Sequence, residues 1–115
     1  MAKRRCISVD IIESEDYAEL SHSAQSLYIE LMFRSDDYGA ISNVRIAMMW
    51  TETTNSELDE LEEKGFLLKV DNVYIITHWN IHNRIPPSKQ NESLYQKQLD
   101  KLILTDDKVY IYKDK

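Results

Sequence analysis

Residues 54–77 read TNSELDELEEKGFLLKVDNVYIIT, and this stretch decides the fold. Thr54 and Glu57 have the spacing of a capping box, which marks the start of a helix. Leu58 and Leu61 would face inward from that helix, and Gly65 stands where a helix end favours a positive φ. The apolar runs on either side of the dipeptide 71–72 then predict two strands joined by a tight turn. The stretch therefore predicts a helix followed by a β-hairpin.

Two further helices are predicted upstream of this stretch. The first would begin at Ser21 or Ser23 and end near Arg34, because apolar residues recur there at helical spacing: Ala24, Leu27, Tyr28, Leu31 and Met32. The second would span 44–50 after Asn43 as the N-cap, with four core candidates: Ile46, Ala47, Met49 and Trp50. Between the two helices, 40–42 could form a very short strand.

The two ends of the chain give weaker signals. Residues 6–12 alternate apolar and polar side chains, which fits a short strand or an extended arm, and 14–21 fit a turn or one helical turn. A final helix is predicted over 92–102, after the stop at Pro86-Pro87, and 109–112 could add a last strand. The predicted fold is α+β and mostly helical: a winged helix-turn-helix with an N-terminal arm and a C-terminal tail helix.

The domain organisation follows from this order. Residues 1–85 would form the winged-helix domain with its arm, and 86–115 a tail that packs on the domain or on a partner chain. A length of 115 residues suits one domain, and the single cysteine, Cys6, excludes an internal disulfide and suits a reducing compartment. No apolar run approaches 18 residues and no stretch resembles a signal peptide, so we expect a cytoplasmic protein without a membrane span.

Charge is distributed unevenly along the chain. The first five residues carry +3, residues 6–77 carry four bases and 15 acids, and residues 78–115 carry seven bases and five acids. The net charge of −6 argues against a protein that binds nucleic acid over its whole surface. If the two basic ends meet in the fold, they form one positive patch on an acidic body; the alternative is that they are only solubilising flanks.

Several stretches together resemble a known family. They are RRCISVDIIES (4–14), LSHSAQSLY (20–28), RSDDYG (34–39), KGF (64–66) and ITHWNIHN (76–83), with the region of Tyr95 and the closing Val109-Tyr110. This pattern resembles the N-terminal domain of phage replisome organisers, a winged-helix family related to the DnaD-type primosome proteins of low-GC Gram-positive bacteria and their phages. The resemblance covers almost the whole chain.

The resemblance implies a role in starting phage DNA replication inside the bacterial host cell. Such proteins bind origin DNA, self-associate and help to bring host replication proteins to it. They usually carry a second, C-terminal domain that contacts the helicase-loading machinery, and nothing like it is present here. Without that domain, the resemblance implies only DNA binding and self-association for this chain.

The candidate DNA-binding residues are basic or polar. Arg and Lys neutralise phosphates, and an N-terminal basic arm can enter a minor groove. The candidates are Lys3, Arg4, Arg5, Arg84 and Lys89, with Lys97 and Lys101 behind them. Asn55 and Ser56 are also DNA-binding candidates, because they begin the helix that would enter the major groove and suit a phosphate or base edge. That helix, however, exposes five carboxylates: Glu57, Asp59, Glu60, Glu62 and Glu63. Major-groove contact by this helix is therefore disfavoured, and its acidic face is either solvated or a surface for a basic protein.

Other chemistry finds little support in the sequence. Leu94, Tyr95, Leu99 and Leu102 form an apolar stripe that would bury against the domain or against a second copy of the chain. His78 and His82 lack a ligand cluster for zinc, so no metal or other cofactor is expected. Trp79 is expected in the core, with stacking on a base as the alternative. Motifs of phosphate loops, hydrolases and metalloproteases are missing, so no catalytic residue and no enzyme is predicted.

Three functions are consistent with these features of the sequence. The first is a DNA-binding, self-associating domain of a phage-type replication-initiation protein. The second is a protein–protein assembly module that does not bind DNA, favoured by the net negative charge. The third is a small winged-helix transcriptional regulator, because a fold does not determine a function.

Overall fold

The longest helix forms where the apolar spacing is clearest. In the computed structural model, which describes residues 4–41 and 43–113, α3 runs from His22 to Arg34. The Ser21 side chain caps it by accepting a hydrogen bond from the Ala24 N–H at 3.1 Å. The five predicted inward residues, Ala24, Leu27, Tyr28, Leu31 and Met32, are fully buried, so this prediction is confirmed.

Two shorter helices pack on α3. Helix α4 (Val44–Thr51) begins at Asn43, whose side chain accepts from the Ile46 N–H, and α5 (Asn55–Glu63) begins with the predicted capping box of Thr54 and Glu57. The predicted core of α4 is mostly wrong. Ala47 is buried, but Ile46, Met49 and Trp50 are 36%, 77% and 72% exposed because they lie on the side of α4 that faces away from α3.

The hairpin forms as predicted, and a third strand pairs with it. Strands β2 (Leu67–Val70) and β3 (Val73–Ile76) are joined by Asp71 and Asn72, both at positive φ as a two-residue hairpin turn of this kind requires. Strand β1 (Ala40–Ile41) pairs antiparallel with β3, so the sheet order is β1-β3-β2. Gly65, after α5, adopts the expected positive φ.

The N-terminal segment differs from its prediction. After an extended stretch, residues 9–12 form a helical turn, α1 (Val9–Ile12), followed by α2 (Glu15–Ala18). The alternating pattern of 6–12 therefore makes no strand among the described residues, since β1 and β2 are the sheet edges and the segment pairs with neither. The helical turn expected within 14–21 is confirmed, with Ser14 as its N-cap.

The prediction of a long C-terminal helix over 92–102 is wrong. The chain instead makes α6 (Trp79–His82), the 3₁₀ turn η1 (Pro87–Lys89), and a single helical turn, α7 (Gln96–Leu99). Strand β4 (Leu102–Leu104) then pairs with β5 (Tyr110–Tyr112) as a separate antiparallel hairpin. A short apolar run such as 102–104 does not distinguish a strand from a helix by periodicity alone, and in the hairpin only Leu102 of the three is buried.

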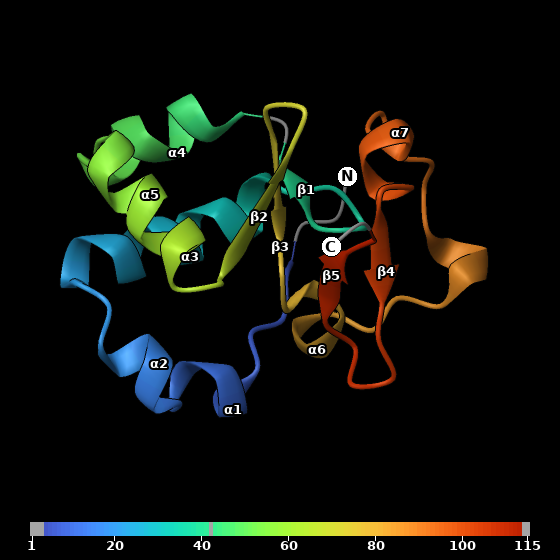
Figure 1. The fold of residues 1–115 in the computed structure, drawn as a ribbon, viewed down its shortest axis with the longest axis horizontal. Helices are drawn as coiled ribbons and strands as arrows, with labels where there is room; N and C mark the ends of the chain where they lie inside the picture. The colour runs from blue at the N-terminus through green and yellow to red at the C-terminus, as the bar shows by residue number, and fades with distance from the viewer. Residues whose placement is uncertain (1–3, 42, 114–115) are drawn as a thin grey trace.

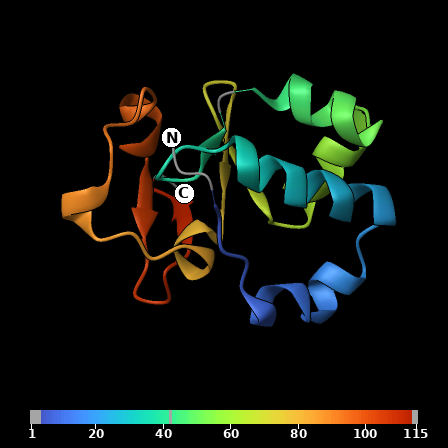
Figure 2. The ribbon, with the colours of Figure 1, turned by 180° about the vertical axis from the view of Figure 1, so that it is seen from behind.

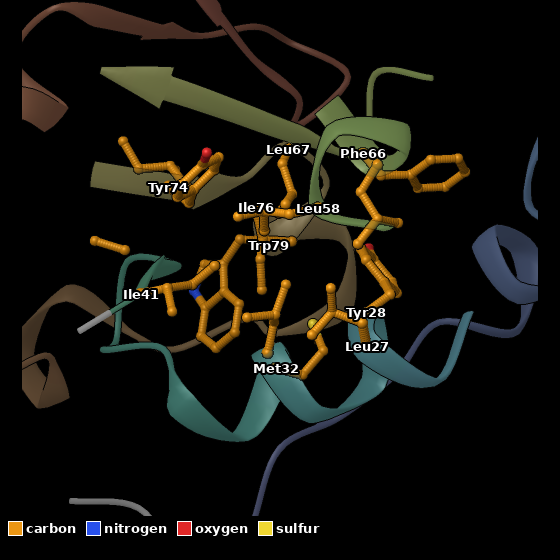
Figure 3. Packing of buried hydrophobic residues seen from close by; sticks show 14 of the residues in the cluster. Leu27, Tyr28, Met32, Ile41, Leu58, Phe66, Leu67, Tyr74, Ile76 and Trp79 are labelled. Carbon is orange, nitrogen blue, oxygen red and sulfur yellow. The ribbon is translucent and has the colours of Figure 1, made fainter. Parts of the chain in front are cut away.

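The elements form two groups around the three-stranded sheet. Figures 1 and 2 show α1 to α5 on one side of it, and α6, α7 and the β4–β5 hairpin on the other. The core lies between α3 and the sheet, where Trp79 is fully buried beside Met32 and Ile76 (Figure 3). Leu99, Leu102 and Tyr110 extend the same core into the C-terminal segment. No helix in the described ranges is both long and apolar enough to cross a bilayer.

Candidate nucleic-acid interface

Arg5 is taken up by the fold rather than displayed on the surface. Its side chain is only 5% exposed. The guanidinium lies 3.3 Å from the Asp37 carboxylate, donates to the Ser35 carbonyl at 2.9 Å, and stacks 5.0 Å from the centre of the Trp79 ring. These contacts occupy guanidinium N–H groups of Arg5 that would otherwise donate to a phosphate. The expectation that Arg5 binds DNA is therefore corrected: Arg5 anchors the N-terminal segment.

Asp37 is the point where both ends of the chain meet. One carboxylate oxygen faces Arg5, and the other accepts from the backbone and side-chain N–H groups of Asn91 at 3.0 and 3.2 Å. The Asn91 backbone bond, with help from Arg5, lowers the pKa of Asp37. The Asp37 carbonyl in turn accepts from the indole N–H of Trp79. The N-terminal segment and the tail are thus held on one turn, 36–39.

The short helix α6 holds the N-terminal segment from the other side. The Asn83 amide exchanges two hydrogen bonds with the backbone of Cys6, at 2.8 and 3.2 Å. The Ser8 N–H donates to Nδ1 of His82 at 2.7 Å, so the proton of the neutral ring sits on Nε2, which lies 2.7 Å from the Tyr28 hydroxyl. Burial lowers the pKa of His82 to about 4, because the fold favours the uncharged ring.

This arrangement gives His82 a structural role. Both of its ring nitrogens are engaged, and the part of the chain that the structure describes contains no group of three His, Cys, Asp or Glu residues placed to hold a metal ion. Trp79 is fully buried, so the alternative that it stacks on a base is excluded.

The anchoring brings three exposed cations together. Arg4, Arg84 and Lys89 line one surface hollow of about 490 Å³ between the N-terminal segment and the chain that follows α6. Asn83 and Asn91 line it too. Within the described residues, no side-chain hydrogen bond or ion pair reaches any of the three cations, which leaves their charge available to a ligand. The two basic ends of the sequence therefore do meet.

The hollow is positively charged in spite of the carboxylate beside it. Asp37 also lines the hollow, but Arg5 neutralises it at 3.3 Å. The remaining charge comes from Arg4, Arg84 and Lys89. Three cations around one concave surface can neutralise neighbouring phosphates of a nucleic acid, and the exposed Asn91 amide has a second N–H that can donate to a phosphate or sugar oxygen.

The other predicted residues lie elsewhere. Asn55 and Ser56 are exposed at the start of α5, in the half of the molecule away from α6 and the tail (Figure 1). Lys101 forms an ion pair with Asp71 at 2.9 Å, and Lys97 is exposed on α7. Lys3 lies outside the described residues.

The predicted self-association stripe is not one face. Leu99 and Leu102 are 9% and 8% exposed and belong to the core of their own domain, which corrects the expectation that they contact a second copy. Tyr95 is half-buried against the same core, and Leu94 alone stands 91% exposed. The stripe fails because residues 92–102 do not form a continuous helix.

Two features of the site had no signal in the sequence. These are Asn83 and Asn91, which join the hollow through long-range bonds to Cys6 and Asp37 that no local spacing reveals.

The exposed side of α4, which lies outside this site, did leave a signal in the sequence. Six of the eight residues of α4 are apolar, more than a short helix can bury against a single neighbour.

Comparison of the chain with protein-family models, with curated proteins and with solved structures found no match.

Proposed function

We propose that this protein is a DNA-binding domain of a phage-type replication-initiation protein, acting by binding rather than by catalysis. The observation that carries the proposal is the meeting of Arg4, Arg84 and Lys89 around one hollow, with no partner among the described residues. The resemblance to phage replisome organisers supplies the biological setting: origin DNA in the bacterial cytoplasm, together with host replication proteins.

The proposed fold family is the winged helix. The order α3, β1, α4, α5, β2, β3 and the pairing of β1 with β3 support it. In that family the helix equivalent to α5 would usually enter the major groove. Here Asp59 and Glu63 are exposed on α5, so a groove contact would bring carboxylates towards phosphates.

The proposed mechanism is neutralisation of phosphates at the hollow. Arg4 and Arg84 can each hold a phosphate with two parallel N–H bonds, and Lys89 adds a third charge. Releasing about three counterions gives a salt slope of roughly −3 on a log–log plot for duplex DNA. Three contacts bind weakly alone, so self-association of the chain would raise the avidity for an origin with repeated sites.

The test is a fluorescence anisotropy titration of labelled duplex and single-stranded DNA at several salt concentrations. We expect binding by the wild-type chain with the slope above, and its loss in the variant R4A/R84A/K89A. The matched control is R45A/K64A/K69A, which removes the same charge from exposed positions on α4, after α5 and on β2.

Each other outcome has a definite meaning. If the control loses binding and the first variant keeps it, the DNA surface lies at the α4–α5 end and the proposal is wrong. If the folded wild-type chain binds no DNA at low salt and micromolar concentration, the assembly module becomes the better function. Comparing origin with promoter fragments separates a replication protein from a transcriptional regulator.

A further inference from the structure

Helix α4 turns an apolar face towards the surface. Ile46, Met49 and Trp50 are spaced i, i+3 and i+4, so they lie on one side of the helix, and all three are exposed. The opposite side, with Ala47 buried and Met48 half-buried, packs on α3. Exposed apolar residues are ordinary when scattered, but a Met–Trp pair on one helical face is typical of a protein-binding surface.

A hollow continues this face towards α5. It has a volume of about 610 Å³ and lies between the end of α4 and the start of α5, lined by Arg45, Met48, Met49, Glu52, Thr53, Thr54 and Asn55. Glu52 ends α4 in a left-handed conformation, which turns the chain sharply at this point. The apolar face therefore borders a concavity as well as a flat helix surface.

The chain that follows this face is strongly acidic, and its first carboxylate, Glu52, lines the hollow. Residues 52–63 carry six carboxylates and no base, and Arg45 is the one cation on α4. Glu57 and Glu60 are used by the fold, in the capping box and in bonds to Ser21. Four others make no ion pair or side-chain hydrogen bond within the described residues: Glu52, Asp59, Glu62 and Glu63.

We propose that this surface binds a basic amphipathic helix from another protein. Apolar side chains of that helix would cover Met49 and Trp50, and its Lys or Arg residues would face the unpaired carboxylates of 52–63. Helix-in-groove binding uses this combination of apolar anchors with a charged rim. Electrostatic complementarity would raise the association rate and exclude acidic partners.

Charge argues against the other occupants. A second copy docking through its own α4 face would bring two acidic α5 helices together. Nucleic acid and anionic membranes would be repelled by the same carboxylates. The proposal is also separate from DNA binding, because the hollow of Arg4, Arg84 and Lys89 is lined by Asn83 and Ile85, next to the end of α6. The figures show α6 and α4 on opposite sides of the sheet (Figures 1 and 2).

The two tryptophans make the surface easy to probe. Trp50 is 72% exposed whereas Trp79 is fully buried, so a blue shift on binding reports Trp50. The probe is a synthetic helical peptide of about 18 residues with Leu at i, i+3, i+4 spacing and Lys elsewhere. One control peptide carries Glu in place of Lys, and another carries Ser in place of Leu.

We expect the Leu/Lys peptide to bind and to shift the Trp50 emission, and both control peptides to bind at least about tenfold more weakly. Calorimetry with M49S should show a similar loss, and D59N/E63Q a several-fold loss. L94S, which removes an exposed leucine outside the surface, should bind like wild type. Circular dichroism checks that each variant is folded.

Three results would overturn the proposal. The first is equal binding of the Leu/Lys peptide and either control peptide, which would mean that charge or apolar contact alone is sufficient. The second is wild-type affinity in M49S, or no binding at low salt. The third is self-association without peptide that M49S abolishes, because a second copy would then be the occupant.

Discussion

Gly39 lets the turn at 36–39 approach Trp79 closely, and an added methyl group tests how tightly the fold depends on this contact. A Cβ at Gly39 would lie 2.7 Å from both Cβ and Cγ of Trp79, and the residue has φ +89°. Trp79 is fully buried and its indole is fixed by the bond to the Asp37 carbonyl, so it has no room to move away. The Gly39→Ala change therefore combines backbone strain with overpacking.

The other glycine, Gly65, provides the reference for the expected loss of unfolding free energy. Gly65 has φ +85°, but nothing lies within 4 Å of a Cβ built there. Gly65→Ala should therefore cost only the left-handed strain, about 1–2 kcal/mol of unfolding free energy. Gly39→Ala carries the same strain plus about 1–3 kcal/mol of overpacking, so we expect a loss of about 2–5 kcal/mol.

The assay is urea unfolding followed by circular dichroism and by tryptophan fluorescence. The difference between the two variants isolates the contact with Trp79, because their φ values differ by only a few degrees. If Gly39→Ala loses no more free energy than Gly65→Ala, the reasoning is refuted and the indole yields to the added methyl group.

Three further predictions concern other contacts. The pKa of His82, about 4, lies below its ordinary value near 6.5, so the unfolded chain binds a proton that the folded chain excludes between these pH values. The unfolding free energy should therefore fall by up to roughly 3 kcal/mol as pH drops from 6.5 to 4, measured by urea unfolding at each pH. Arg5→Met should lose about 3–5 kcal/mol, because it leaves a carboxylate without its cation, whereas Arg4→Met should change stability by less than about 0.5 kcal/mol. Leu99→Ala should lose about 2–5 kcal/mol, and Leu94→Ala should leave stability nearly unchanged.

Each of these predictions has a result that would contradict it. An NMR titration of the His82 ring with a midpoint near 6.5 would mean that the buried bonds do not hold the neutral form. Equal stabilities of the Arg5 and Arg4 variants would remove the structural role assigned to Arg5. A change in solution mass with Leu99→Ala, without loss of stability, would return that residue to an interface between copies.

The helices and turns in the middle of the chain were predictable because their signals are local, although the core residues of α4 were not. The capping box of Thr54 and Glu57, the Asn43 cap and the turn at 71–72 each depend on neighbours within a few residues. The spacing of the α3 apolar residues is likewise a property of one helix. Contacts with the rest of the molecule therefore have little influence on whether these elements form.

The ends were not predictable because distant residues decide them. Leu99 and Leu102 fit a helical stripe, but the tail is held by Asp36 and Asp37, more than fifty residues away, and Leu102 pairs with Tyr112. The role of Arg5 depends on the position of Trp79, which no spacing in the sequence indicates. The meeting of Arg4 with Arg84 and Lys89 was expected only as a condition, because charge counts show that both ends are basic but not that they touch.

The turn at 36–39 has a consequence for synthesis on the ribosome. Its contacts come from the N-terminal segment, from 79, from 90–93 and from the Tyr110 hydroxyl, which donates to the Tyr38 carbonyl. During translation this turn emerges long before most of its partners do. Helix α3 can form early, but the turn gains the last of these contacts only when residue 110 has left the exit tunnel. A pulling-force measurement on stalled nascent chains should therefore show one late folding step, and chains ending before 110 should stay open to protease at the turn.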